Sequence, residues 1–185
     1  MSESLRVAPL DASHRSRVEA IVRATGVFSV EEVGVAMEVF DDAVAESGGR
    51  KADSVSDYDL LGAFAGDQLV GYAAFGPTPA TDRTFDLYWI AVHPDSQGGG
   101  AGTALMDAVE RRLTDGRARM LVIETSSRDD YAPTRTFYKK RGYQESARLR
   151  DFFSSGDDRL VLTRRLDAAP SPDGPDRSHL PDPHP

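Results

Sequence analysis

The residues from Gln97 to Gly102 form the part of this 185-residue chain with the clearest chemical potential. They read Gln-Gly-Gly-Gly-Ala-Gly, follow the apolar run 85–92, and precede apolar residues at helical spacing. Four glycines leave the backbone uncovered where a helix should begin, and the first turn of a helix presents free N–H groups to anions. We therefore expect this loop to bind a phosphate group.

Two common phosphate-binding loops do not match this stretch. A P-loop needs a lysine after its last glycine, and no lysine follows these glycines. A dinucleotide-binding Gly-x-Gly-x-x-Gly loop also fails, because its sixth position falls on Thr103 or Leu105. The pattern that fits is Gln-x-x-Gly-x-Gly, formed by Gln97, Gly100 and Gly102. A plain glycine-rich turn between a strand and a helix is the alternative.

A second motif follows on a segment predicted to be helical over 132–141. It reads Phe-Tyr-x-x-x-Gly-Tyr and is formed by Phe137, Tyr138, Gly142 and Tyr143. In this order the two motifs resemble those of the GNAT N-acetyltransferase superfamily, whose loop signature binds acetyl-CoA, and the resemblance covers roughly residues 5–166. It implies an α/β (α+β) fold in which a mixed, mostly antiparallel sheet is flanked by helices.

The resemblance also implies how the cosubstrate acetyl-CoA is held. Backbone N–H groups of the loop would converge on the pyrophosphate, and a neighbouring strand would bond the pantetheine arm as an added strand would. The loop residues are Gln97, Gly98, Gly99, Gly100, Ala101, Gly102 and Thr103; the strand residues are Ile90, Ala91 and Val92. Phe137 and Tyr138 would lie beside the arm.

For the chemistry, the resemblance implies that Tyr138 donates a proton to the departing coenzyme A thiolate. A phenol with an ordinary pKa of about 10 is neutral at pH 7 and can donate a proton. The alternative is that Tyr138 is a half-buried aromatic residue packing on the sheet. Phe137 is expected to pack in the core or against the pantetheine arm.

Two carboxylates are candidates for the base that deprotonates an acceptor amine. Asp86 lies on the apolar strand 85–92, where some GNAT members place a carboxylate base, and Glu124 lies near the end of the next buried strand. Strict alternation would put Asp86 on the same face as Ile90 and Val92, and burial would raise its pKa. Either carboxylate could instead be ion-paired with an arginine or solvated, and water could relay the proton.

The acceptor site is expected between two segments, the loop 25–29 and the hairpin 150–158. Arg148, Arg150 and Asp151 could recognise a carboxylate or an amine there, or could be solvated hairpin residues. Many GNAT members carry an asparagine after the second motif strand. This chain departs from them with Arg-Asp-Asp-Tyr at 128–131.

Composition limits the other functions. The net charge of −8 argues against a nucleic-acid surface, and the chain has no cysteine and four scattered histidines without metal-ligand spacing. No apolar run is long enough to cross a membrane, and the N-terminus lacks an apolar signal core. We therefore expect a cytoplasmic protein without metal, nucleic-acid or membrane partners, with a homodimer as a possible assembly.

The chain is expected to form one GNAT domain over residues 1–167 and a disordered, proline-rich acidic tail over 168–185. Expected strands are 6–10, 60–64, 69–75, 85–92, 120–125, 145–153 and 159–165. Expected helices run through 18–22, 33–44, 104–113 and 132–141, the second starting with a capping box at Ser29.

The leading hypothesis is an enzyme that transfers acetyl from acetyl-CoA to the primary amine of a small molecule by direct attack in a ternary complex. One alternative is the acetylation of a protein lysine or N-terminus. Others are a non-catalytic acyl-CoA-binding regulatory module and a Rossmann-like nucleotide enzyme. No motif identifies the acceptor.

Overall fold

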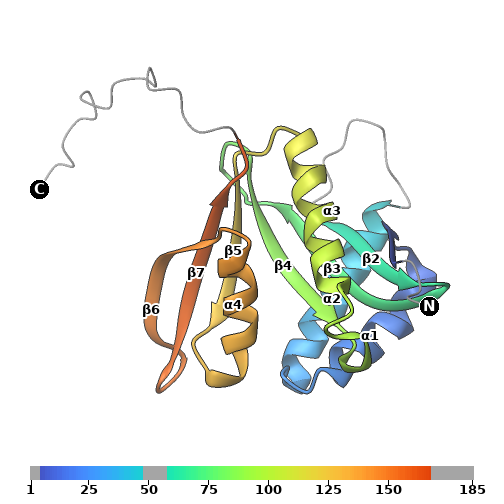
Figure 1. The fold of residues 1–185 in the computed structure, drawn as a ribbon, viewed down its shortest axis with the longest axis horizontal. Coiled ribbons are helices and arrows are strands. Elements are labelled where there is room, and N and C mark those ends of the chain that lie inside the picture. The colour runs from blue at the N-terminus through green and yellow to red at the C-terminus, as the bar shows by residue number, and fades with distance from the viewer. Residues whose placement is uncertain (1–4, 48–57, 168–185) are drawn as a thin grey trace, which may run out of the picture.

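The computed structural model describes residues 5–47 and 58–167. The tail 168–185, predicted to be disordered, lies outside the described residues. The described part forms one sheet with helices on both faces (Figure 1). This arrangement confirms the predicted mixed, mostly antiparallel sheet flanked by helices.

Seven strands form the sheet in the order β1-β2-β3-β4-β5-β7-β6. All neighbouring pairs are antiparallel except β4 and β5, which are parallel. The strands are β1 (Leu5–Pro9), β2 (Asp59–Ala65), β3 (Gln68–Pro77), β4 (Thr84–Val92), β5 (Met120–Ser126), β6 (Gln144–Ser154) and β7 (Asp157–Arg165). Each predicted strand is present, with ends that differ by a residue or two.

Helices α1 (Arg15–Ala24) and α2 (Val30–Ser47) lie on one face of the sheet, and α3 (Ala101–Asp115) and α4 (Ala132–Lys140) lie on the other (Figure 1). We call these the α1–α2 face and the α3–α4 face. The predicted capping box begins α2. The Ser29 hydroxyl accepts from the Glu32 N–H (3.2 Å), and the Glu32 carboxylate accepts from the Ser29 N–H (2.7 Å).

An apolar core lies on each face of the sheet. On the α3–α4 face, Leu105 and Val109 of α3 are fully buried in the same core as Leu121 of β5. On the α1–α2 face, Ile21 of α1 and Phe40 of α2 are buried in the second core. Because each such side chain stabilises the fold by about 1.5–3 kcal/mol when buried, the two cores hold the central strands firmly from both sides.

A β-bulge interrupts β4 at Tyr88. The register with β3 jumps there and leaves Tyr88 as an extra residue. Leu87 before the bulge packs on the α3–α4 face, and so do Ile90 and Val92 after it. The alternation expected from the sequence is therefore wrong, because Asp86 lies on the opposite face from Ile90 and Val92.

The strands β4 and β5 pair over only part of their length. The parallel ladder runs from Thr84 to Leu87 on β4, opposite Met120 to Ile123 on β5. Past these residues each strand has a free edge that faces the other. The pairing ends next to the bulge at Tyr88. After the bulge, the side chains of β4 alternate between the two faces of the sheet in the opposite order, and β4 is no longer bonded to β5.

Strand β6 forms the outer edge of the sheet (Figure 1), and every one of its residues is exposed. Its register with β7 is irregular between Glu145 and Ala147 and between Leu149 and Ser154. The homodimer considered from the sequence stays a prediction.

Gly71 of β3 allows β4 and α3 to approach closely. A Cβ at this position would lie 2.9 Å from the carbonyl oxygen of Ala91 and 3.3 Å from Cδ1 of Leu105. A backbone oxygen cannot move without shifting β4, so we expect Gly71→Ala to lower the free energy of unfolding by about 1–3 kcal/mol. Urea denaturation measures this change.

Gly34→Ala is the matched control. Gly34 lies on the exposed surface of α2, and a Cβ added there would meet no atom within 4 Å. Alanine favours a helix over glycine, so this variant should gain up to about 1 kcal/mol. The same sign of change in both variants would contradict the steric argument.

Candidate functional site

A cavity of about 270 Å³ lies where β4 and β5 lose their pairing. Residues 87–90 of β4 and 123–126 of β5 form two of its walls. The other lining residues are Phe28, Glu32, Arg128, Tyr131, Thr134, Tyr138, Phe153 and Asp157. The cavity thus brings together side chains from both segments expected to shape the acceptor site, 25–29 and 150–158.

The glycine-rich turn lies directly before α3. Gly98 and Gly100 have φ angles of +77° and +89°, a backbone conformation that favours glycine. The N–H groups of residues 101–103 begin the helix and so have no carbonyl one turn earlier to bond. The Gln97 side-chain amide donates to the carbonyl oxygen of Val92 (3.3 Å), which ties the turn to the end of β4. The turn therefore places an anion-binding helix N-terminus beside the free edge of β4.

Tyr138 lies on α4, is almost fully buried, and lines the cavity. Its ring packs edge-on against Phe137 and Tyr143, with centroid separations of 5.4 and 5.7 Å. Burial raises the pKa of its hydroxyl well above the usual tyrosine value, so this hydroxyl stays protonated at neutral pH. A protonated hydroxyl in a cavity wall has a proton to donate, and the raised pKa makes it a weaker acid than an exposed tyrosine.

Asp86 lies in the paired part of β4 and is not among the residues that line the cavity. Its carboxylate accepts a hydrogen bond from the Thr78 hydroxyl (2.7 Å). Burial raises the pKa of Asp86 above its usual range and Glu124 adds to this, while the Thr78 bond and Arg159 oppose it. The raised pKa expected for Asp86 is therefore present, away from the cavity wall.

Glu124 does line the cavity, and its carboxylate forms an ion pair with Arg159 of β7. The guanidinium of Arg159 also lies over the ring of Phe152, 4.8 Å from its centroid. The arginine-paired alternative considered for Glu124 is thus the arrangement found. The carboxylate of Glu124 is therefore already engaged by a cation at the cavity wall.

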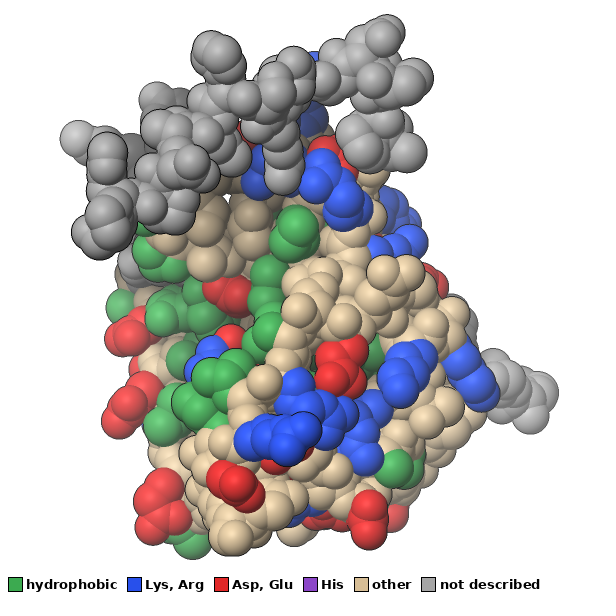
Figure 2. Space-filling model, turned by 90° about the vertical axis from the view of Figure 1, so that its left-hand side faces the viewer, with side chains coloured by type: hydrophobic (Ala, Val, Ile, Leu, Met, Phe, Trp, Pro, Cys, Tyr) green, Lys and Arg blue, Asp and Glu red, His purple; other side chains and the backbone are tan. Residues whose placement is uncertain are grey.

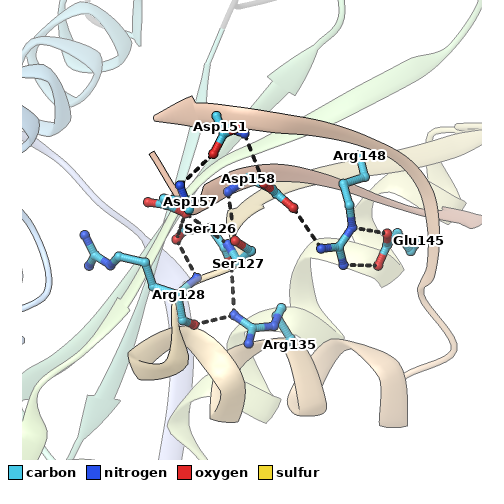
Figure 3. A network of polar contacts seen from close by, with 10 residues as sticks. Ser126, Ser127, Arg128, Arg135, Glu145, Arg148, Asp151, Asp157 and Asp158 are labelled. Atoms are coloured by element: carbon cyan, nitrogen blue, oxygen red, sulfur yellow. Dashed lines mark hydrogen bonds and ion pairs between the residues drawn. The ribbon is translucent and has the colours of Figure 1, made fainter. Parts of the chain in front are cut away.

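Asp157 is a cavity residue that the sequence analysis missed. It begins β7, is 5% exposed, and accepts hydrogen bonds at Oδ1 from the Ser126 hydroxyl (2.5 Å) and the Ser127 N–H (3.2 Å) (Figure 3). Within residues 5–47 and 58–167 it has no ion-pair partner. The sequence Gly-Asp-Asp at 156–158 reads as a solvated turn, and nothing in it distinguishes the buried aspartate.

Residues 126–127 and 157–158 together form what we call the β5–β7 clasp (Figure 3). The Ser127 N–H donates to the carbonyl oxygen of Asp158 (3.0 Å), and the Asp158 N–H donates to the Ser127 hydroxyl (2.8 Å). Arg135 of α4 donates to the carbonyl oxygens of Ser126 (2.9 Å) and Arg128 (2.6 Å). The clasp therefore anchors the start of α4 to the ends of two strands.

Arg148 and Asp151, considered above for acceptor recognition, take part in bonds within the hairpin. Arg148 forms ion pairs with Glu145 (2.9 Å) and Asp158 (3.0 Å). Asp151 accepts a backbone N–H bond of 2.6 Å from the hairpin turn (Figure 3). Arg150 is exposed, and none of Arg148, Arg150 and Asp151 lines the cavity.

No helix in the described part of the chain is long and apolar enough to cross a membrane. Nor does that part contain three or more His, Cys, Asp or Glu side chains grouped to hold a metal ion.

Known proteins share both the sequence pattern and the fold. The family model described as "Acetyltransferase (GNAT) domain" matches residues 56–145. A solved structure from Desulfovibrio desulfuricans, assigned to the GNAT family as a candidate acetyltransferase, is 36% identical with a TM-score of 0.77. The match covers 89% of this chain and 99% of that one. No curated protein matches the sequence significantly.

Two more distant structures share the fold. The ribosomal-protein-S18-alanine N-acetyltransferase of Escherichia coli is 17% identical, with a TM-score of 0.66 over 90% of this chain and 96% of its own. An aminoglycoside 6'-N-acetyltransferase complexed with coenzyme A is 14% identical, with a TM-score of 0.69. The match covers 90% of this chain and 99% of that one. By name, one acts on a protein and the other on a small molecule, so the fold alone does not select the acceptor.

The environment of Asp86 leads to a prediction on stability. Asp86→Asn keeps an acceptor for the Thr78 hydroxyl but removes a charge that burial disfavours. A carboxyl whose folded pKa is raised destabilises the fold once the pH exceeds its unfolded pKa of about 4. The variant should therefore match the wild type below that pH and become the more stable protein as the pH rises through the folded pKa. Urea denaturation across this range measures the difference, and a difference independent of pH would contradict the assignment.

Proposed function

Because the chain belongs to the GNAT family of acetyltransferases, we propose that it transfers the acetyl group of acetyl-CoA to the primary amine of a small molecule. The reaction is a direct attack within a ternary complex. The observation that carries this proposal is the size and place of the cavity. Its volume of about 270 Å³ is close to the lower end of the volumes of small-molecule binding sites. It lies where the facing edges of β4 and β5 have no strand partner.

Acetyl-CoA would occupy the free edge of β4 and the turn before α3. The backbone of Ile90, Ala91 and Val92 has no partner on β5, so a pantetheine arm with its own amides can add there as a strand would. The pyrophosphate would meet the N–H groups of residues 97–103, at the positive end of the α3 dipole. The thioester would then reach the cavity beside Tyr138.

The chemical step forms a carbon–nitrogen bond, breaks a carbon–sulfur bond, and moves one proton off the amine and one onto the sulfur. The amine nitrogen attacks the thioester carbonyl carbon, the carbon–sulfur bond breaks, and the thiolate takes a proton from the Tyr138 hydroxyl. The amine loses a proton to a carboxylate or to water. Glu124 lines the cavity but is paired with Arg159, whereas Asp86 has the raised pKa but lies outside the lining. Both remain candidates for the base, with water as the relay for Asp86.

Acetylation of a protein amine is the second candidate. It is favoured by one neighbour, which is named for a ribosomal-protein substrate. A peptide needs an open groove for the residues that flank its amine, whereas aromatic side chains from two sides line this cavity.

The expected cytoplasmic location stays a prediction.

Coenzyme A release from acetyl-CoA in the presence of polyamines, amino acids, aminoglycosides and lysine-containing peptides tests the function. Release that depends on a small amine supports the proposal. Release with peptides alone would favour the second candidate, and acetyl-CoA binding without release to any amine would indicate a non-catalytic module.

Gly102→Ala tests the cofactor site. A Cβ at this position would lie 3.8 Å from Val92 and 4.0 Å from Phe137, which are ordinary contacts, so the unliganded variant should be at least as stable as the wild type. The methyl group would stand where the pyrophosphate approaches the backbone. We expect acetyl-CoA affinity, measured by calorimetry, to fall by about tenfold or more, the equivalent of about 1.4 kcal/mol. Gly34→Ala should leave this affinity unchanged, and wild-type affinity in Gly102→Ala would place the pyrophosphate elsewhere.

Tyr138→Phe tests the proton donor. Removal of the hydroxyl should lower kcat by about 10²-fold or more, with little change in acetyl-CoA affinity. Tyr143→Phe is the matched control, because the Tyr143 hydroxyl bonds Glu110 (3.0 Å) and does not line the cavity. Equal turnover in the two variants, with chemistry shown to be rate-limiting, would reduce Tyr138 to a packing residue.

A further inference from the structure

The charges around the cavity do not balance. The charged side chains that line it are Glu32, Glu124, Asp157 and Arg128. Glu124 is neutralised by Arg159, and Arg128 is neutralised by Asp130 (2.9 Å). Among the described residues, Glu32 and Asp157 have no ion-pair partner. Arg128 also interacts electrostatically with Asp157 and so serves two carboxylates. The four carboxylates of Glu32, Glu124, Asp130 and Asp157 against the two arginines leave an excess of two negative charges at the cavity.

Among the described residues, the hydrogen bonds to these two carboxylates come from neutral groups alone. Asp157 accepts from the Ser126 hydroxyl and the Ser127 N–H, both at Oδ1, and Glu32 accepts from the Ser29 N–H at Oε2. Each carboxylate thus keeps one oxygen that accepts no hydrogen bond from the described residues. A carboxylate as buried as Asp157 is costly without a counter-charge, so a cationic ligand would be bound strongly there.

Aromatic side chains lie beside these carboxylates. Phe28 and Trp89 pack with ring centroids 5.3 Å apart, and the other aromatic lining residues are Tyr88, Tyr131, Tyr138 and Phe153. On the side of the molecule that carries β6, hydrophobic side chains gather in a band with both acidic and basic ones beside them (Figure 2). Aromatic faces attract ammonium groups and pack against methylene chains.

Among the described residues, the arginines at this cavity are already paired and do not offer a free cation to an acidic acceptor. The guanidinium of Arg128 is bonded to both carboxylate oxygens of Asp130 (3.1 and 2.9 Å), and that of Arg159 is paired with Glu124. A carboxylate on the acceptor would meet these neutralised arginines and be repelled by Glu32 and Asp157. An amino acid is therefore a poor fit for the site.

We propose, on the basis of the proposed function, that the acceptor is a small aliphatic di- or polyamine without a carboxylate, and that Asp157 and Glu32 bind the ammonium group that does not react. The two carboxylates are specificity-determining residues in this assignment. Their hydrogen-bond donors fix their orientation, and the aromatic side chains hold the methylene chain between the two nitrogens.

Three amines with the same carbon chain length test separately whether the enzyme prefers a second ammonium group and whether it rejects a carboxylate. 1,5-Diaminopentane, L-lysine and n-pentylamine differ only in a carboxylate or in a second ammonium group. We expect kcat/KM for the diamine to exceed each of the others by about tenfold or more, the range of one hydrogen bond to a charged group. Use of L-lysine as efficient as that of the diamine would overturn the proposal.

Two substitutions connect this preference to the carboxylates. Asp157→Asn and Glu32→Gln each keep an oxygen that accepts the existing hydrogen bonds and remove one negative charge. Each should lower the diamine-to-pentylamine ratio of kcat/KM several-fold, while Glu31→Gln, an exposed neighbour outside the lining, should leave it unchanged. An unchanged ratio in both cavity variants would overturn the assignment.

The failure of this inference is distinguishable from failure of the proposed function. Acetylation of amines without preference for the diamine would leave the function standing and reject the substrate class. If no amine is acetylated, the function fails, and calorimetric titration into protein saturated with coenzyme A still tests the substrate class. Binding of 1,5-diaminopentane more tightly than L-lysine would support it, and equal or absent binding would reject it.

Discussion

Backbone hydrogen bonds in the middle of a sheet are normally continuous, and in this protein they stop between β4 and β5 after Leu87. The N–H and C=O groups beyond that point must find other partners, because an unbonded polar group shielded from water is costly. The two apolar cores oppose closure of the strands, since β4 is held by α1 on one face and by α3 on the other. A ligand with amide groups of its own can complete the interrupted ladder. The cavity follows from the same interruption.

Polar bonding keeps this opening in a defined shape. The β5–β7 clasp fixes the end of β5 and the start of α4, so Tyr138 approaches the cavity from a rigid helix. At the other end of α4, Glu110 of α3 pairs with Arg141 (2.9 Å), the residue that follows the helix. The helix that carries Tyr138 is thereby held at both ends. Small displacements of such a group would lower the rate steeply, because catalysis depends on geometry within fractions of an ångström.

Local chemistry made much of this structure predictable. The glycines of 97–102 indicated an anion-binding helix start, the second motif indicated α4, and together they led to the GNAT family and its fold. The bulge at Tyr88 was not predictable, since it depends on the register that β4 adopts against β3 and not on the residue itself. The sequence did not predict Asp157 as a cavity residue for a related reason. Whether an aspartate after a turn is solvated or buried depends on what the opposite strand end offers, here the hydroxyl of Ser126 and the N–H of Ser127.

The outermost strand also shapes how this molecule behaves in a crowded solution. An exposed edge strand is a template on which other chains can add and aggregate. Strand β6 is exposed along its whole length and carries Phe152 and Phe153 near its end. Its two register breaks and its charged residues, among them Glu145, Arg148 and Arg150, prevent a long uniform ladder from forming on it. The protein can therefore keep a hairpin projecting beside its cavity without that hairpin serving as a seed for fibrous assembly.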